Sequence, residues 1–251
     1  MEALPPLRAT RSEFAPTGVL RAGINLGNPV IAQKDPAGGD PRGVGPELAR
    51  ELARRLDVPI GYVLYESAGK MAEAVKGLAW DVAFLALDPA RAADIDFSPP
   101  YVEIEGTYLV RRASPLKGIE DVDRDGVRVA AGDNTAYELF LRRHLKRAQL
   151  VRFATSEAAV AQFLHDGLDA AAGVRQALAA AALRFSDLRV LDGHFLVIRQ
   201  AAGVPKGRTR AALFLAEFIE QAKASGRIAR ALEASGVRDV SVAPRAEDLP
   251  R

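Results

Sequence analysis

Short apolar runs alternate with stretches of helical periodicity along most of the chain. The apolar runs predict strands at residues 19–25, 60–65, 81–87, 105–112, 126–132, 150–153, 168–174, 188–191 and 195–204. Apolar positions at helical spacing predict helices at residues 45–56, 68–78, 135–145, 156–167, 175–183, 208–226 and 227–236. Because the strands are apolar throughout and alternate with helices, the pattern predicts an α/β protein with mainly parallel sheets covered on both faces.

One helix-to-strand unit occurs twice in the sequence. Residues 71–85 (MAEAVKGLAWDVAFL) and 160–174 (VAQFLHDGLDAAAGV) each contain an amphipathic helix, a glycine and then an aspartate that begins an apolar strand. The glycines suit helix C-caps. The repeat predicts two lobes of similar construction, although the match is short and coincidence is the alternative.

Composition narrows the classes of function. The chain has 251 residues, 49% of them hydrophobic, which is enough for one large domain or two lobes. A formal net charge of +2 with scattered basic residues indicates no binding of nucleic acid. The absence of cysteine rules out disulfides and thiolate chemistry, and the three histidines lack metal-ligand spacing. No apolar run reaches the roughly 20 residues of a membrane span, so no membrane insertion is expected.

Both ends of the chain are expected to lie outside the folded lobes. Residues 1–17 are polar and proline-rich, which predicts a flexible arm, and residues 241–251 are expected to form a loose tail. The arm lacks the apolar core of a signal peptide. The sequence as printed therefore predicts a cytoplasmic protein, or a periplasmic one if Met1 stands where a leader was removed.

Six segments in a fixed order carry a resemblance to a known family. They are LRAGIN, DPAGGDPRGVGPELARELARRL, AVKGLAWDVAFLALDPARAADIDFSPPY, GVRVAAGDNTAYE, FLHDGLDAAAGV and ASGRIARALE. From Gly18 to Gly236 the chain resembles the family 3 solute-binding proteins, the polar amino-acid receptors of ABC importers, as an atypical member without a signal peptide. The most specific part is the third segment, in which a helix, a glycine, an aspartate-led strand, Pro-x-Arg and DFS-P-Y follow in family order.

The resemblance implies a two-lobed fold of the periplasmic-binding-protein type II. Lobe 1 would comprise residues 18–108 and 200–240, lobe 2 residues 109–199, and two crossover strands would join them near 105–112 and 195–204. Such a protein binds a small ligand in the cleft between the lobes and closes on it by a hinge motion, as a monomer or weak dimer. The resemblance implies no enzymatic activity and no cofactor, and an ABC transporter permease is the expected partner if the protein is exported.

Arg91 is the candidate that this resemblance places at the ligand carboxylate. It follows a predicted buried strand, and the carboxyl ends of parallel strands line ligand crevices. Its guanidinium has a planar fork of donors that matches a carboxylate. The alternative is an exposed loop arginine paired with Asp88 or Asp94.

The turn GDNTAY (residues 132–137) would face the same carboxylate from the second lobe. Backbone N–H groups at a helix start bind anions, and Thr135 can act as N-cap and hydroxyl donor. Asn134 belongs to the same turn, and Tyr137 lies one turn into the helix. A plain N-cap role for Thr135 and a packing role for Tyr137 are the alternatives.

Several positions depart from the family pattern. Ala86 stands where a serine or threonine is usual, and Asn28 stands where an aromatic residue is common. The acid that meets an α-ammonium group would be expected at Asn25 or at Val174, which is followed by Arg175. These departures cast doubt on a standard α-amino acid as the ligand.

Two explanations remain open for the missing acid. Glu103 and Glu105 point the same way on a strand, so one of them could bind an ammonium group, with a solvent-facing strand edge as the alternative. The ligand could instead lack an ammonium group, and Arg175 would then be a second anion contact for a dicarboxylate or similar acid, or simply a helix-surface arginine. The expected ligand is therefore an amino acid or an organic acid.

Two other functions compete with plain binding. A dehydratase-like enzyme on the same fold would need a general acid, which Glu103 or Glu105 could supply if closure raised its pKa. A cytosolic ligand sensor is the other alternative, since the printed sequence has no export signal. His194 is expected to have only a turn or surface role.

Overall fold

The computed structural model describes residues 7–248 and divides the chain into two compact units. Unit 1 comprises the chain up to Tyr65, the segment Lys70–Glu103 and the chain from Arg199 onward, and unit 2 comprises Glu66–Gly69 and Ile104–Ile198. Apart from the short segment Glu66–Gly69, the chain passes between the units after residues 103 and 198, where the sequence suggested 108 and 199.

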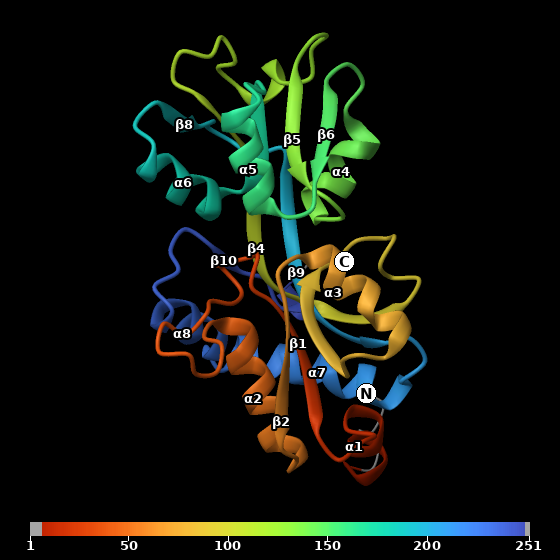
Figure 1. Cartoon of the computed structure of the whole chain (residues 1–251). Helices are drawn as coiled ribbons and strands as arrows, with labels where there is room; N and C mark the ends of the chain where they lie inside the picture. The colour runs from red at the N-terminus through yellow and green to blue at the C-terminus, as the bar shows by residue number, and fades with distance from the viewer. Residues whose placement is uncertain (1–6, 249–251) are drawn as a thin grey trace. The chain divides into compact units, whose positions relative to one another are not determined.

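The elements follow the predicted alternation (Figure 1). The first half contains α1 (Leu7–Phe14), β1 (Leu20–Asn25), α2 (Val44–Leu56), β2 (Ile60–Tyr65), α3 (Ala68–Glu73), the 3-10 helix η1 (Ala74–Gly77), β3 (Val82–Ala86), β4 (Ile95–Arg111) and η2 (Ile119–Asp121). The second half contains β5 (Arg128–Gly132), α4 (Ala136–His144), β6 (Gln149–Phe153), α5 (Ser156–His165), β7 (Ala170–Val174), α6 (Arg175–Arg184), β8 (Leu188–Val190), β9 (Leu196–Pro205), α7 (Thr209–Ala224), α8 (Arg227–Ala234), β10 (Ser241–Val242) and η3 (Ala246–Asp248).

Unit 1 is built on strands in the order β2-β1-β3-β9. Strand β1 pairs in parallel with β2 and β3, and β9 pairs with β3 in the antiparallel direction. Helix α2 packs on β1 and β2, and α7 packs on α1 and α8. The sheet is thus parallel where helices connect its strands and antiparallel at the strand that returns from unit 2.

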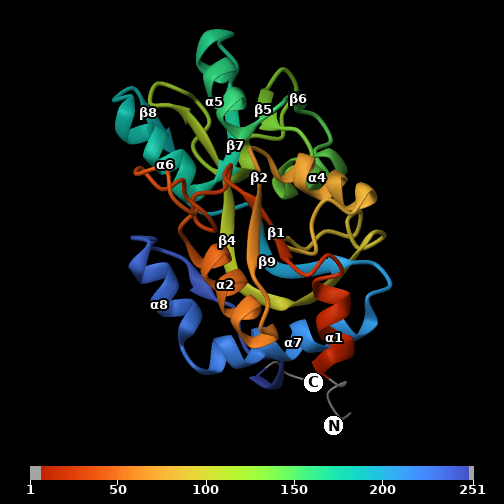
Figure 2. The same ribbon diagram turned by 60° about the horizontal axis from the view of Figure 1, so that its bottom comes forward.

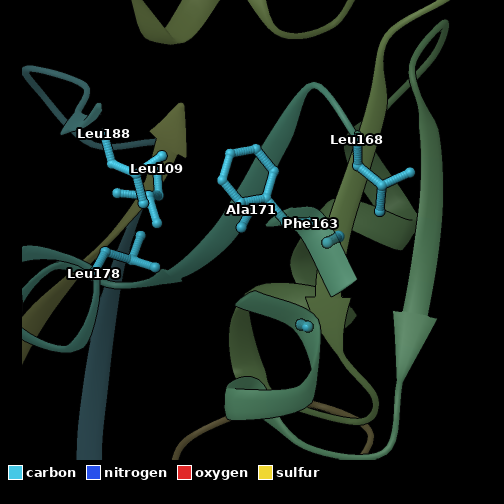
Figure 3. Packing of buried hydrophobic residues seen from close by; sticks show 8 residues of the cluster. Leu109, Phe163, Leu168, Ala171, Leu178 and Leu188 are labelled. Atoms are coloured by element: carbon cyan, nitrogen blue, oxygen red, sulfur yellow. The ribbon is translucent and has the colours of Figure 1, made fainter. Parts of the chain in front are cut away.

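Unit 2 repeats this plan with the order β4-β7-β5-β6. Strand β5 is parallel to β6 and β7, and β4 is antiparallel to β7 and β8. Figure 3 shows the core between the sheet and helices α5 and α6, which includes Leu109, Phe163, Leu168, Leu178 and Leu188. The α/β fold with helix-covered, mainly parallel sheets is confirmed, and each sheet also contains antiparallel strands.

The repeated helix-to-strand segment occupies equivalent places in the two units. In unit 1 the backbone N–H of Asp81 donates to the Arg21 carbonyl, and the Asp81 carboxylate accepts the N–H of Arg21. In unit 2 Asp169 and Arg128 exchange the same two bonds. The sequence repeat therefore corresponds to a structural repeat.

Part of the predicted flexible arm is a helix. Residues 7–14 form α1, and the side chain of Phe14 is fully buried and packs edge-on against Phe214 of α7, with ring centroids 6.1 Å apart. The Glu13 carboxylate also accepts the backbone N–H of Ala211 at 2.9 Å. Both views show α1 beside α7 (Figures 1 and 2). The apolar contact at Phe14 explains why this polar segment is ordered; residues 1–6 lie outside the described residues.

The predicted tail also contacts unit 1. Val242 of β10 pairs with Val102 of β4, and Lys223 donates from Nζ to the carbonyl of Pro244 at 2.8 Å. Strand β4 begins at Ile95, ten residues before the strand predicted at residues 105–112. Within residues 7–248 no helix is both long and apolar enough to span a membrane.

Candidate functional site

The carboxyl ends of β1 and β3 lie at one edge of the unit 1 sheet. The two strands are parallel neighbours, with Ala22 opposite Val82, and they end at Asn25 and Ala86. The side chain of Asn25 accepts the N–H of Gly27 at 2.9 Å through Oδ1. The end of β1 therefore places the short polar side chain of Asn25 at the edge where parallel sheets bind ligands.

Asn28 closes the loop that follows β1. Its Oδ1 accepts the backbone N–H of Val30 at 3.2 Å, and its carbonyl accepts the N–H groups of Ile31 and Ala32. Asn25 and Asn28 are each 8% exposed. The amide oxygens of both side chains thus hold the loop in place, and no aromatic side chain is needed for that.

Arg91 is buried, with 6% of its surface exposed. Its Nη1 donates to the carbonyl of Ala86 at 3.0 Å, and the Asp88 carboxylate shapes the intervening turn by accepting the N–H of Ala90. Burial lowers the pKa of Arg91 to about 10, against the opposing effect of the Asp88 charge, so the side chain stays cationic at neutral pH. The alternative of an exposed loop arginine is wrong.

Glu103 of β4 lies at the edge of unit 1 where the chain leaves for unit 2. Its Oε1 accepts from Nε of Arg199 at 3.1 Å, and its backbone pairs with Ser241 of β10. The side chain is 25% exposed. Glu103 is therefore part of an ion pair that links β4 to β9.

Helix α4 of unit 2 begins at the predicted carboxylate-binding turn. Oγ1 of Thr135 accepts the N–H of Glu138 at 3.2 Å and donates its proton to the carbonyl of Gly132 at 2.8 Å. Asn134 is exposed and adopts a left-handed backbone conformation with φ of 53°. Because the Thr135 proton is already donated, a ligand contact at this turn falls to backbone N–H groups.

Two side chains in the first turn of α4 are buried. The hydroxyl of Tyr137 is 2.6 Å from Oγ of Ser156, and the residue is 3% exposed, which matches the packing role. Glu138 is fully buried, accepts the N–H of Asn134 and lies 3.6 Å from Nε of Arg142. Burial raises the pKa of Glu138, with the Arg142 charge opposing it. Sequence reasoning overlooked Glu138, although the T-x-x-E spacing of a capping box could have identified it.

Arg175 begins α6 and is tied into unit 2 on several sides. Its Nε donates to Glu105, and its Nη atoms donate to the carbonyls of Leu191 and Gly193. His194 also contacts Glu105, with Nδ1 3.1 Å from Oε1. Arg175 is thus not a plain surface arginine, and its positive charge is already paired with Glu105.

The expected general acid is not supported at Glu105. Burial by itself would raise the pKa of this carboxyl, but the ion pair with Arg175 and the charge of His194 together hold it below its usual value. Glu105 is therefore ionised at neutral pH, and a pKa raised by closure stays a prediction. His194, assigned only a surface or turn role from the sequence, belongs to this cluster.

Comparison with protein families identifies the chain. The family model of the bacterial extracellular solute-binding proteins, family 3, matches residues 20–234. The chain belongs to this family. A comparison with the sequences of curated proteins found no match.

Solved structures of solute receptors share the family fold. The ArgBP mutant of T. maritima has a TM-score of 0.77 at 22% identity, with 90% of this chain and 99% of that chain covered. A solute receptor for L-cysteine from Neisseria gonorrhoeae has a TM-score of 0.78 at 21% identity, covering 92% and 93%. The ancestral amino acid-binding protein AncCDT-1, a precursor of cyclohexadienyl dehydratase, has a TM-score of 0.75 at 24% identity, covering 90% and 98%. At these identities the likeness shows the fold.

The predicted family site is thus distributed over the two units in separate groups. Unit 1 brings Asn25, Asn28, Ala86 and Arg91 to one edge of its sheet, with Glu103 further along β4. Unit 2 gathers Asn134, Thr135 and Tyr137 at the start of α4, and Arg175 at the end of β7. A surface hollow lined by Asp133 and residues 149–154 contains none of these side chains.

Proposed function

We propose that this protein is a solute receptor that binds a small ligand bearing a carboxylate, either an amino acid or an organic acid. The observation that carries the proposal is the buried cation of Arg91 at the carboxyl end of β3. Burying a charge costs free energy, so a guanidinium kept at a strand edge is a candidate for function. Membership of a solute-binding family supports the same role.

In this proposal each unit contributes one half of the ligand contacts. Arg91 binds the carboxylate through the parallel donors of its guanidinium, a charge-assisted interaction of about 1.5–3 kcal/mol. The start of α4 adds backbone N–H groups and the positive end of the helix dipole. A ligand that needs both halves stabilises a closed arrangement of the units, so binding and hinge closure are coupled.

Replacement of Arg91 tests the carboxylate contact. A thermal-shift screen of amino acids, dicarboxylates and aromatic acids first finds a ligand, since one at 100 times its Kd adds about 2.7 kcal/mol. Arg91→Lys keeps the charge but loses the fork of donors, and we expect calorimetric affinity to fall at least tenfold, about 1.4 kcal/mol. Arg91→Ala should lose more affinity and also some stability, because the side chain is buried and bonded to Ala86.

Arg184→Ala serves as the matched control, because Arg184 is an exposed arginine at the end of α6. Its affinity should equal that of the unmodified protein. Circular dichroism confirms that each variant is folded before titration. Unchanged affinity in a folded Arg91→Lys variant would remove Arg91 from the binding site.

Coupled closure and the partner are tested separately. We propose that the receptor works outside the cytoplasmic membrane, in line with the word extracellular in its family's description, and delivers its ligand to an ABC transporter permease. Small-angle scattering should show a smaller radius of gyration with ligand than without it. The mature N-terminus in the native cell decides the location: processing of a leader supports export, whereas an intact Met1 with the protein in the cytoplasmic fraction favours a ligand sensor.

A further inference from the structure

The ligand edge of unit 1 has hydrogen-bond donors to spare but few acceptors. Asn25 and Asn28 are more than nine-tenths buried, and each uses its amide oxygen for a backbone N–H of its own loop. Within residues 7–248 their Nδ2 groups donate to no protein acceptor. Neither nitrogen belongs to the side-chain atoms that are both fully buried and unpartnered. Each side chain therefore keeps two N–H donors for a bound molecule.

The acceptors at the end of β3 already receive hydrogen bonds from the protein. Ala86 has no polar side chain, and its carbonyl accepts from Arg91 at 3.0 Å. The Asp88 carboxylate accepts the N–H of Ala90 at 2.9 Å, and its charge acts on Arg91. The positive charge of Arg91 at the same strand end favours an electron-rich group on the ligand.

In unit 2, taken by itself, the candidate acceptors are likewise already bonded within the protein. Its strand β7 ends at Val174, an apolar residue, followed by the cation of Arg175. The Glu105 carboxylate is bonded to Arg175 and His194. The Thr135 hydroxyl already accepts one hydrogen bond and donates another.

We infer that the ligand is a carboxylic acid without an ammonium group, and that Asn25 is a residue that determines this specificity. The inference rests on the proposed function. An ammonium group has three donors and no acceptor. If it faced amide N–H groups and a guanidinium, it would lose its hydration without gaining hydrogen bonds in return. A second carboxylate, a carbonyl or a hydroxyl accepts from the same N–H groups, so a dicarboxylate, oxo acid or hydroxy acid fits this edge.

Glu66 is the residue that could support the opposite preference. It follows directly after β2, beside the end of β1, because Tyr65 pairs with Asn25. It is exposed, and in the part of the chain that the structure describes its carboxylate accepts no hydrogen bond from the protein. If the ligand has an ammonium group, Glu66 is its available partner on this side, so the Glu66→Gln variant distinguishes the two outcomes.

Matched ligand pairs provide the first test. Calorimetry compares succinate with L-aspartate, glutarate with L-glutamate, 4-methylpentanoate with L-leucine and 3-phenylpropanoate with L-phenylalanine. We expect the acid without the amino group to bind at least tenfold more tightly in every pair that binds. Tighter binding of the amino acid, lost in Glu66→Gln, overturns the inference but leaves the proposed function intact. Failure of all eight compounds to bind overturns the proposed function and the inference together.

The Asn25→Asp variant provides the second test. The change is nearly isosteric and keeps an acceptor for the N–H of Gly27, but it replaces two donors with a negative charge. We expect the amine-free acid to bind at least tenfold more weakly and its amino-acid counterpart to bind more tightly.

Gln149→Glu is the matched control for this variant. Gln149 is exposed on β6, and its replacement by glutamate introduces the same negative charge. It should leave both affinities unchanged. Thermal melting verifies that Asn25→Asp is folded. Affinities that do not respond to a folded Asn25→Asp variant would show that Asn25 does not determine specificity.

Discussion

Asp81 and Asp169 occupy equivalent positions in the two units but differ in burial. The Asp81 side chain is fully buried and receives two hydrogen bonds from the guanidinium of Arg21 and one from Arg208. The Asp169 side chain is 40% exposed, and the nearest guanidinium nitrogen of Arg128 is 3.6 Å away. The same sequence feature therefore has different energetic weight in each unit.

Replacement of these two aspartates should separate the two environments. Asp81→Asn leaves Arg21 and Arg208 without their buried counter-ion, so we expect a loss of about 3–5 kcal/mol of unfolding free energy. The fluorescence of Trp80, the single tryptophan and fully buried in unit 1, reports the denaturant transition.

Asp169→Asn is the matched control, and its half-exposed ion pair should contribute less than about 1 kcal/mol. Circular dichroism follows its transition, because Trp80 lies in unit 1. Equal losses for the two variants would contradict the assigned role of burial.

At the scale of elements, a carboxylate joins helices α2 and α8. Glu51 of α2 is bonded to Arg54 and Arg55 of its own helix, and Arg227 at the start of α8 lies 3.5 Å away. These arginines, Arg54 first, lower the pKa of Glu51 from 4.5 to about 2, although burial acts in the opposite direction. The ionised form is therefore favoured in the folded state.

This lowered pKa predicts acid sensitivity. The contribution of Glu51 to stability is complete above about pH 5 and is lost as the pH falls toward about 2, because the unfolded state then binds the proton first. Urea titrations should show that the free energy of unfolding decreases from pH 6 to pH 3 in the unmodified protein. In Glu51→Gln this decrease should be smaller by about 1–2 kcal/mol. Glu47→Gln on the same helix, at a more exposed carboxylate, should keep most of the decrease. A Glu51→Gln profile that parallels the unmodified protein would argue against this linkage.

The link between η1 and β3 was predicted incorrectly in one detail. The sequence indicated Gly77 as the helix cap, but Leu78 is the residue with left-handed backbone, with φ of 50°. Its side chain is 52% exposed, so little burial offsets this conformation. A non-glycine residue in this region costs about 1 kcal/mol.

Substitution at this position should relieve the strain. We expect Leu78→Gly to be more stable than Leu78→Ala by about 1 kcal/mol, because both remove the side chain and only glycine accepts positive φ freely. Thermal melting of the two variants measures the difference. A more stable Leu78→Ala would mean that the strain is negligible.

At the scale of the whole molecule, unit 1 is assembled from distant parts of the sequence. Helix α1 packs on α7, about 200 residues later, through Phe14 and Phe214. Arg208 adds a bond from Nη1 to the carbonyl of Glu13 at 2.8 Å. Unit 1 therefore joins α1, near the start of the described residues, to α7 near their end.

Phe14→Ala tests whether this contact matters for stability. Removal of a fully buried ring should cost about 3–4 kcal/mol, since the cavity refills only in part. Denaturation followed by Trp80 fluorescence measures the loss within unit 1. Phe185→Ala, at a residue 40% exposed after α6, is the control and should lose far less. A flexible arm, as first expected, would give no loss for Phe14→Ala.

The sequence by itself determined most of the secondary structure from residue 19 to 236, though not the start of β4 at Ile95, together with the repeated helix-to-strand unit and the family. Apolar runs, helical periodicity and turn residues are local properties, so the pattern reports them directly. The resemblance to the family indicated Arg91 as a candidate, and the position of Arg91 after a predicted buried strand agreed with it.

Only the tertiary structure decided which partners the polar side chains have. Glu105 has a lowered pKa because Arg175, 70 residues away, lies against it, and α1 is ordered because Phe14 meets a helix near the other end of the chain. Such contacts depend on how distant segments meet, which no local pattern records. The charge and the hydrogen bonds of each polar side chain follow from those contacts, because burial and neighbouring charges set the free energy of each ionised group.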